Sequence, residues 1–182
     1  ARHAFASLGY GAATNRDLAA QAGITAGTLY HYFGSKLDLY VAVNDDVHDL
    51  VYGRINEAMD AVDGFVAKWE AVLETASELN RYDPTLAQFL GSSRVDMRRH
   101  PEIAAALRAH AARRNQLFTT LVDEGVRTGE IDPEHRGMLL ELVTTILVGL
   151  TDAVSDDYAR HRRAIDAVKL VVRGELLHRV PA

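Results

Sequence analysis

Residues 14–36 read TNRDLAAQAGITAGTLYHYFGSK and predict two short helices joined by a tight turn. Thr14 and Asp17 have the spacing of a capping box at the start of the first helix. Gly23 is a residue type that readily takes the positive φ common just after a helix. Thr25 is a favoured N-cap for the second helix. This order of caps and turn is typical of a helix-turn-helix, with helices over residues 15–22 and 26–33.

The second of these helices carries most of the residues that we expect to contact DNA, because it is the one that enters the major groove in helix-turn-helix proteins. The small residues 26–28 are expected to face base edges, whereas Thr14, Tyr32 and Lys36 are expected to hold phosphates. Lys36 opens the next helix, where a phosphate would meet both its charge and free backbone N–H groups. The predicted DNA-binding residues are Thr14, Arg16, Thr25, Ala26, Gly27, Thr28, Tyr30, His31, Tyr32 and Lys36.

At these positions the chain resembles the tetracycline-repressor (TetR) family of bacterial regulators. The resemblance covers roughly the first quarter of the chain, and it departs from the family at Ile24, Thr25 and Leu37, where valine, serine and glutamate are commoner. It implies a helix-turn-helix domain over residues 1–34 and a ligand-binding and dimerisation domain over residues 35–182. The matching residues are Phe5, Gly9, Thr14, Leu18, Ala19, Ala22, Gly23, Gly27, Thr28, Leu29, Tyr30, Tyr32, Phe33, Ser35, Lys36 and Leu39.

Composition excludes several other classes of protein. The chain has 182 residues, 48% of them hydrophobic, and no cysteine, so it has no disulfide and no thiolate metal site. No apolar run reaches the length of a membrane span. Residues 1–43 carry a net charge of +1, whereas the whole chain carries −5. Non-specific attraction to DNA should therefore be weak, and affinity should depend on fit and dimerisation.

The rest of the chain reads as helices, since it shows no alternation typical of strands. Three of the four prolines follow an aspartate or histidine, which is typical of a cap followed by the first helical residue. We therefore predict an all-α fold of about nine helices. Their expected ranges are 1–8, 15–22, 26–33, 35–62, 65–80, 84–99, 101–128, 133–155 and 157–179.

The predicted eighth helix is apolar on most sides, and such a helix must be covered all round. In a chain of this size a second subunit is the expected cover, with the ninth helix beside it. Gly149 would permit a close approach of backbones. The residues predicted at the dimer interface are Val143, Ile146, Leu147, Gly149, Leu150, Ile165, Val168, Val172 and Leu176.

The resemblance also implies a ligand cavity among the fourth to eighth helices. Pockets are mostly apolar with a few placed polar groups, so we select large apolar and isolated polar residues, although each taken singly is more often a core residue. Arg94 would favour a carboxylate; the alternative is that it pairs with Asp96 or Glu102. The candidate ligand-binding residues are Trp69, Phe89, Arg94, Met97, His110, Asn115, Phe118, Met138, Glu141 and Thr145.

Together these observations predict a cytoplasmic, ligand-responsive transcriptional regulator. By resemblance it would be a repressor that binds a palindromic DNA operator as a homodimer and is released by a small apolar molecule. We expect no catalytic residues, no cofactor, no metal and no membrane association. One alternative keeps DNA binding but places it under the control of a protein partner or metal. The other is an all-helical protein whose helix-turn-helix is only a packing motif.

Overall fold

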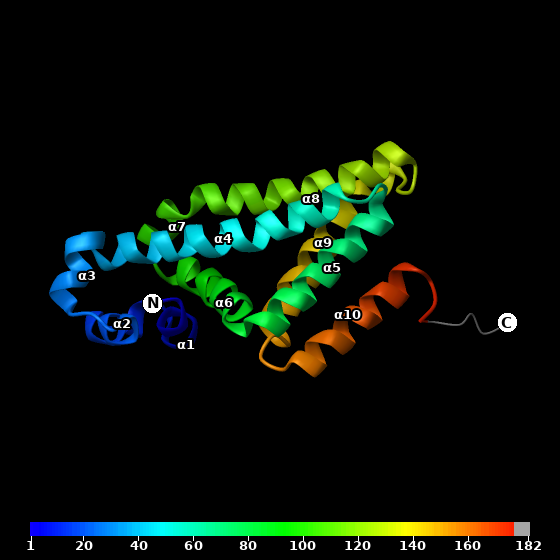
Figure 1. Cartoon of the computed structure of the whole chain (residues 1–182). Coiled ribbons are helices and arrows are strands. Elements are labelled where there is room, and N and C mark those ends of the chain that lie inside the picture. The colour runs from blue at the N-terminus through cyan, green and yellow to red at the C-terminus, as the bar shows by residue number, and fades with distance from the viewer. Residues whose placement is uncertain (177–182) are drawn as a thin grey trace. The chain divides into compact units, whose positions relative to one another are not determined.

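The computed structural model describes residues 1–176 and confirms the all-α prediction (Figure 1). Within these residues there are ten α-helices, one short 3-10 turn and no strand. None of the described helices is long and apolar enough to cross a membrane. Residues 177–179, predicted as the end of the last helix, lie outside the described part of the chain.

The helices form two compact units. The first unit comprises residues 1–53 and 85–115, with α1 (Arg2–Ala12), α2 (Asn15–Ala22), α3 (Ala26–Phe33), most of α4 (Lys36–Asp60), α6 (Pro84–Arg99), α7 (Pro101–Ala106) and the start of α8 (Arg108–Thr128). The second comprises residues 54–84 and 116–176, with α5 (Phe65–Tyr82), most of α8, η1 (Pro133–His135), α9 (Arg136–Ala153) and α10 (Tyr158–Val172). Compactness thus groups residues differently from the predicted functional domains, and the boundary after residue 34 stays a prediction.

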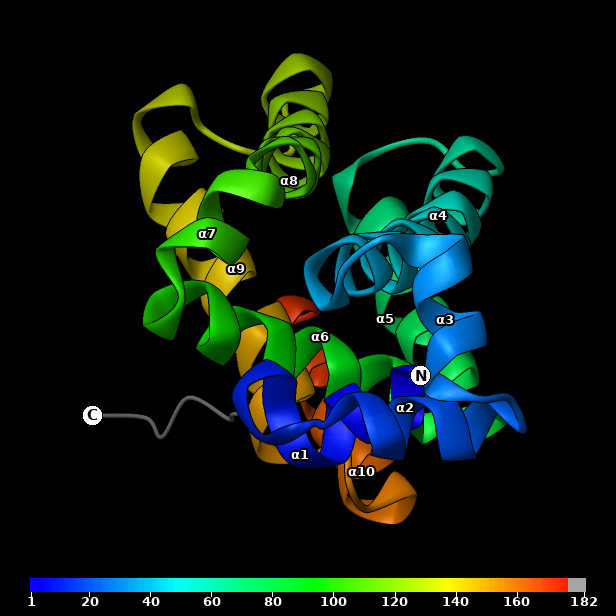
Figure 2. The same cartoon turned by 90° about the vertical axis from the view of Figure 1, so that its left-hand side faces the viewer.

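An aromatic cluster holds α1, α4 and α6 together in the first unit. Figure 2 shows α1 beside α6. Phe5, Tyr40 and Phe89 are fully buried, and the Tyr40 ring lies 4.9 Å from Phe5 and 5.6 Å from Phe89 between centroids. The Ser92 hydroxyl donates to the Phe5 carbonyl oxygen over 3.1 Å. Aromatic contacts of this kind add to the burial of apolar area, so α6 is firmly attached to the helix that precedes the helix-turn-helix.

The second unit is organised around α5. The side chain of Glu130 caps this helix, because its carboxylate accepts from the backbone N–H groups of Phe65 at 2.6 Å and Val66 at 3.2 Å. Gly125 on α8 is closely covered: a Cβ there would stand 2.2 Å from the Ile131 side chain. Lys169 of α10 donates to the Glu74 carboxylate of α5 over 2.6 Å. These contacts fix α8 and α10 against α5.

Three predicted helix boundaries are wrong. The first helix continues to Ala12 through a kink at Gly9, whose φ of 73° glycine adopts without strain. The predicted seventh helix is broken at Leu107 into α7 and α8, because this buried residue leaves helical geometry at φ −95° and ψ 12°. The last helix ends at Val172, where Gly174 takes φ 72° and the Glu175 N–H bonds back to the Leu170 carbonyl oxygen, a common helix ending.

Candidate functional site

The helix-turn-helix is capped as its sequence predicts. The Thr14 hydroxyl accepts from the Asp17 N–H over 3.2 Å, and the Asp17 carboxylate accepts from the Thr14 N–H over 3.0 Å. Hydrogen bonds from Thr14 lower the pKa of Asp17. Gly23 ends α2 at φ 67°, and the Thr25 hydroxyl accepts from the Thr28 N–H over 3.1 Å. These local bonds set the angle between α2 and α3 and confirm the predicted motif.

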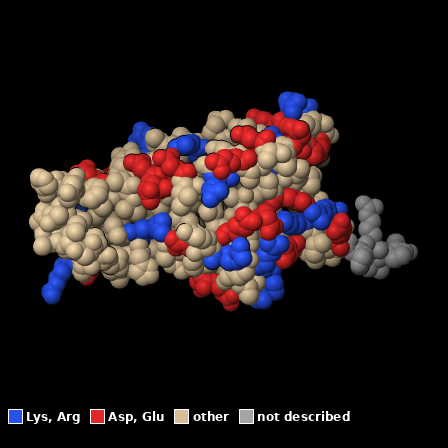
Figure 3. Space-filling model, in the orientation of Figure 1, with Lys and Arg blue, Asp and Glu red and all other residues tan. Residues whose placement is uncertain are grey.

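The ten predicted DNA-binding residues are all accessible. Thr28 and Lys36 are half-buried and the other eight are exposed, with Tyr32 at 74%. Leu29 on the opposite side of α3 is buried, which leaves the small first turn and the following donors facing outward. On the face drawn in Figure 3, few charged side chains lie over α2 and α3. Their contacts with DNA remain a prediction.

Lys36 contacts Tyr10, which is in turn bonded to the buried Asp96 of α6. Its ammonium nitrogen stands 4.5 Å from the centroid of the Tyr10 ring, a favourable cation–π position. Burial lowers the pKa of Lys36, and the charge of Asp96 opposes that effect. The backbone N–H of Tyr10, just after the α1 kink, donates to the Asp96 carboxylate over 2.9 Å. A residue predicted to hold a phosphate is therefore positioned by α6 through Tyr10.

Two further hydrogen bonds join α4 to α6, one of them at Asp96. The same carboxylate oxygen accepts from the Tyr40 hydroxyl over 3.0 Å, and Asp96 is only 5% exposed. Burial raises the pKa of Tyr40, and a hydrogen bond with Ser93 partly offsets this rise. The Asn44 amide donates to the Ser93 hydroxyl over 3.0 Å. We call the set Asn44, Ser93, Tyr40, Asp96 and Tyr10 the polar chain.

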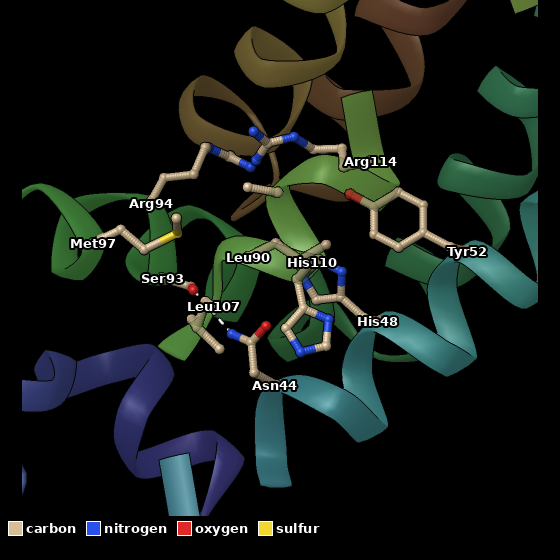
Figure 4. A pocket seen from close by; sticks show the side chains of 11 residues that line it. Asn44, His48, Tyr52, Leu90, Ser93, Arg94, Met97, Leu107, His110 and Arg114 are labelled. Carbon is tan, nitrogen blue, oxygen red and sulfur yellow. Dashed lines mark hydrogen bonds between the residues drawn. The ribbon is translucent and has the colours of Figure 1, made fainter. Parts of the chain in front are cut away.

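A pocket lies at the far end of the polar chain, where side chains of α4, α6, Leu107 and α8 converge (Figure 4). Its volume is about 10 Å³, close to the least that holds one water molecule. Any larger ligand must therefore widen it. The lining residues are Asn44, His48, Tyr52, Leu90, Ser93, Arg94, Met97, Leu107, His110, Ala111 and Arg114.

Two histidines meet in this pocket. The rings of His48 and His110 have centroids 4.7 Å apart, and His110 Nε2 lies 2.7 Å from an Asp45 carboxylate oxygen. Burial lowers the pKa of His48 to about 4, with further contributions from the positive charges of His110 and Arg114. His48 is therefore neutral at physiological pH. Among residues 1–176, no group of three or more histidine, aspartate or glutamate side chains is placed to hold a metal ion.

The structure brings together only three of the ten predicted ligand-binding residues, Arg94, Met97 and His110. Trp69, Phe89 and Phe118 are core residues with at most 6% exposure, because aromatic side chains at helical spacing pack against neighbouring helices. The pocket does not include the remaining four, which are exposed: Asn115, Met138, Glu141 and Thr145. The prediction that all ten surround one cavity is not reproduced.

Sequence reasoning missed several pocket residues. Asn44, His48 and Tyr52 recur every four residues on α4, so they share one face of that helix. His110 and Arg114 have the same spacing on α8. A polar residue at every fourth position of these helices was the available signal.

The predicted dimer residues divide into two groups. Val143, Leu150 and Ile165 are at most 6% exposed, so helices of the same chain already cover them. The other six remain accessible in part or fully: Ile146, Leu147, Gly149, Val168, Val172 and Leu176. Met138 and Leu142 lie on the same helix, α9, and are 73% and 52% exposed. They line a mainly apolar hollow of about 290 Å³. Part of the α9 surface is therefore apolar and accessible, and binding of a second subunit there stays a prediction.

Comparison with known proteins agrees with this geometry. Residues 1–43 match the model of the bacterial regulatory proteins of the tetR family. The HTH-type transcriptional repressor KstR2 of Mycolicibacterium smegmatis is 25% identical over 71% of this chain, and the chain spans 63% of its length. The HTH-type transcriptional regulator UidR of Escherichia coli is 22% identical over 97% of this chain and 89% of its own.

The fold of the whole described chain agrees as well. The structure of FadR from Bacillus subtilis, solved in complex with stearoyl-CoA, superposes with a TM-score of 0.77 at 18% identity. The superposition covers 97% of this chain and 95% of FadR. The capped helix-turn-helix, the match over residues 1–43 and this shared fold lead to one conclusion: residues 1–43 form a helix-turn-helix similar to that of the tetR family, and the described chain has the same fold as solved regulators such as FadR.

Proposed function

We propose that this chain is a cytoplasmic repressor that binds a palindromic operator as a homodimer and is released by a small molecule. In this proposal α3 of each subunit enters the major groove, and the predicted phosphate contacts fix its register. The small molecule binds in the pocket between α4, α6 and α8. The observation that carries the proposal is the polar chain, whose hydrogen bonds join α4 to α6 at the pocket and α6 to Tyr10 of α1 within one compact unit.

The release mechanism is a shift between two conformations. A pocket of about 10 Å³ accepts a ligand only when the helices that line it, α4, α6 and α8, move apart. A ligand that binds only the widened pocket draws the protein toward that state, and its effect equals its difference in affinity for the two states. The hydrogen bond between Asn44 and Ser93 joins these two helices. Widening the pocket therefore acts on the polar chain and, through it, on α1.

The dimer in this proposal uses the exposed face of α9 together with α10. Gly149 lies on that face, and a Cβ added there would meet no atom within 4 Å, so a larger side chain fits the isolated chain. We expect Gly149→Arg to leave the fold intact, to weaken the dimer in sedimentation, and to weaken operator binding with it. A Gly149→Arg protein that sediments like the wild type would exclude this face as the interface.

The proposal is tested first by selection of DNA. The purified chain is mixed with random-sequence duplexes, and bound molecules are recovered and sequenced. We expect a two-fold symmetric sequence with half-site centres separated by about 10–10.5 base pairs or a multiple of that distance. The Lys36→Ala protein, which is expected to bind all DNA sequences more weakly, serves as the comparison. Failure to enrich any sequence, from protein that is folded by circular dichroism, would refute the role as an operator-binding repressor.

Control by a protein partner is the second candidate, and the small volume of the pocket favours it. In that case the pocket would be packing between α4, α6 and α8, and no small molecule would enter it. The two candidates differ in what happens when the pocket is filled. Ala111 lines the pocket, and Ala111→Leu would occupy the remaining space. A small-molecule response that survives this change would place the ligand elsewhere.

A further inference from the structure

A hydrogen bond between side chains joins the two helices of the helix-turn-helix. The amide nitrogen of Asn15, the first residue of α2, donates to the phenol oxygen of Tyr30 on α3. Tyr30 is 42% exposed and lies one turn after Ala26, on the accessible side of α3. The bond therefore holds a side chain on the surface that we expect to face DNA.

The direction of this bond decides what Tyr30 can offer to DNA. An amide N–H only donates, so Asn15 occupies an acceptor position on the phenol oxygen. Within residues 1–176 no other hydrogen bond involves the Tyr30 hydroxyl, so its proton has no acceptor there. The oxygens of a DNA phosphate are acceptors that tyrosine hydroxyls contact. The Tyr30 hydroxyl is thus held as a donor for an acceptor outside the chain.

An asparagine in this place lowers stability. The Asn15 side-chain oxygen is buried and makes no hydrogen bond within the described residues, which is unfavourable for an acceptor. Asn15 also occupies the first turn of α2, where a carboxylate would interact favourably with the helix dipole. Residues that break such local rules are expected at functional sites. The bond to Tyr30 therefore accounts for Asn15 better than stability does.

We infer that Asn15 is a positioning residue that orients the Tyr30 hydroxyl so that its proton is donated to a phosphate of the operator. Asn15 acts through Tyr30, and Tyr30 makes the contact with DNA. This inference rests on the proposed function, because Tyr30 is one of the predicted DNA-binding residues. It adds to them a residue of α2 and gives each of the two side chains a separate role.

The first experiment measures whether the two side chains act together. Asn15→Ala, Tyr30→Phe and the double variant are titrated against the selected operator by fluorescence anisotropy at several salt concentrations. We expect Tyr30→Phe to lose affinity about tenfold, as for one hydrogen bond to a charged group, and Asn15→Ala to lose about threefold or more. The double variant should bind like Tyr30→Phe, because both changes remove the same contact. The salt slope should stay unchanged, since a neutral hydroxyl releases no counterion.

Tyr32 provides the matched control for this pair. It lies on the same helix and is 74% exposed, whereas the bond from Asn15 goes to Tyr30. Tyr32→Phe makes the same chemical change without removing a partner of Asn15. When it is combined with Asn15→Ala, the loss of affinity should equal the product of the two single losses.

Asn15→Asp separates positioning from stability, and it carries the test if Asn15→Ala does not fold. A carboxylate accepts the Tyr30 proton that a phosphate would need, while its charge favours the first turn of α2. We expect Tm to be at least that of wild type and operator affinity to fall about tenfold or more. In the Tyr30→Phe protein the same change should cost less affinity, because only repulsion between the new charge and DNA remains.

The results separate this inference from the proposed function. Wild-type operator affinity in the folded Asn15→Asp protein would overturn the positioning role. So would an effect of either Asn15 change that is equally large with and without the Tyr30 hydroxyl. A chain that selects an operator but gives either result keeps the proposed function and loses this inference. A wild-type chain that selects no DNA sequence refutes the proposed function and the phosphate contact with it.

Discussion

Removing one hydroxyl from the polar chain is the sharpest test of its role. Tyr40 is fully buried, and its hydroxyl donates to the same Asp96 oxygen that accepts from the Tyr10 N–H. Tyr40→Phe keeps the ring against Phe5, where the centroids are 4.9 Å apart. The change therefore removes one of the two hydrogen bonds between α4 and α6, at the carboxylate that holds Tyr10, without opening a large cavity.

The size of the effect follows from the bond that is lost. A hydrogen bond to a charged group contributes about 1.5–3 kcal/mol, and burial of both partners keeps solvent from replacing it. We expect the free energy of unfolding to fall by that amount, which lowers Tm by about 2–4 °C for each kcal/mol in a chain of this length. The Lys36 ammonium group contacts the Tyr10 ring. Greater mobility of Tyr10 therefore also makes the position of this predicted phosphate contact less fixed. Each 1.4 kcal/mol corresponds to tenfold, so the upper limit of the loss in operator affinity, reached when the whole effect is passed to DNA binding, is about 10- to 140-fold.

The assay measures operator affinity by fluorescence anisotropy and stability by thermal unfolding on the same preparation. Tyr82→Phe is the matched control, because this tyrosine is 87% exposed and lies at the end of α5. It should change neither quantity. A Tyr40→Phe protein with reduced Tm but with wild-type operator affinity and wild-type release by ligand would show that the polar chain only stabilises the fold.

Three further predictions concern separate parts of the chain. Lys36→Ala should weaken binding to all DNA sequences and reduce the salt slope of log Kd by about 1; an unchanged slope would remove Lys36 from the phosphate contacts. Gly125→Ala should lower stability by about 1–3 kcal/mol in urea, because its methyl would stand 2.2 Å from Ile131; equal stability would mean that the unit repacks. Hydrogen bonds from Thr128 and from backbone N–H groups lower the pKa of Glu130, so its ionised form stabilises the fold above the ordinary glutamate pKa of about 4.3. Glu130→Gln should therefore be less stable than wild type at neutral pH, by under about 1 kcal/mol at this exposed site, and the difference should vanish as the pH falls through the lowered pKa; a constant difference would contradict the cap.

The sequence predicts the helix-turn-helix well because its determinants are local. Thr14 with Asp17, Gly23 and Thr25 each act on residues within one helical turn. The break at Leu107 has no such signal, since no glycine or proline marks it. It follows from packing, because Leu107 is buried and lines the pocket. At Leu107, tertiary packing outweighs the helix propensity of the local sequence.

The pocket and the polar chain depend on partners far apart in sequence. Tyr10 and Asp96 are separated by 86 positions, and Asn44 and Ser93 by 49. Periodicity alone places Asn44 and His48 on one face of α4, but it does not say which helix they meet. Trp69, predicted as a ligand contact, is a 1%-exposed core residue outside the pocket. Long-range pairing, rather than residue type, decides which polar groups form a site.

We expect a ligand that enters the pocket to affect α1, because the hydrogen bonds of the polar chain connect the helices around the pocket to α1. Asn44 lies one turn after Tyr40 on α4, and Asp96 lies one turn after Ser93 on α6, so both inter-helix bonds span the same pair of helices. Each bond is 3.0 Å long, and a separation of α4 from α6 by on the order of 0.5 Å is enough to break it. A small molecule needs more room than one water molecule. Where its entry separates α4 from α6, it either breaks these bonds or moves α6 together with α1, which is attached through Tyr10. Both outcomes change the contact between the Tyr10 ring and Lys36.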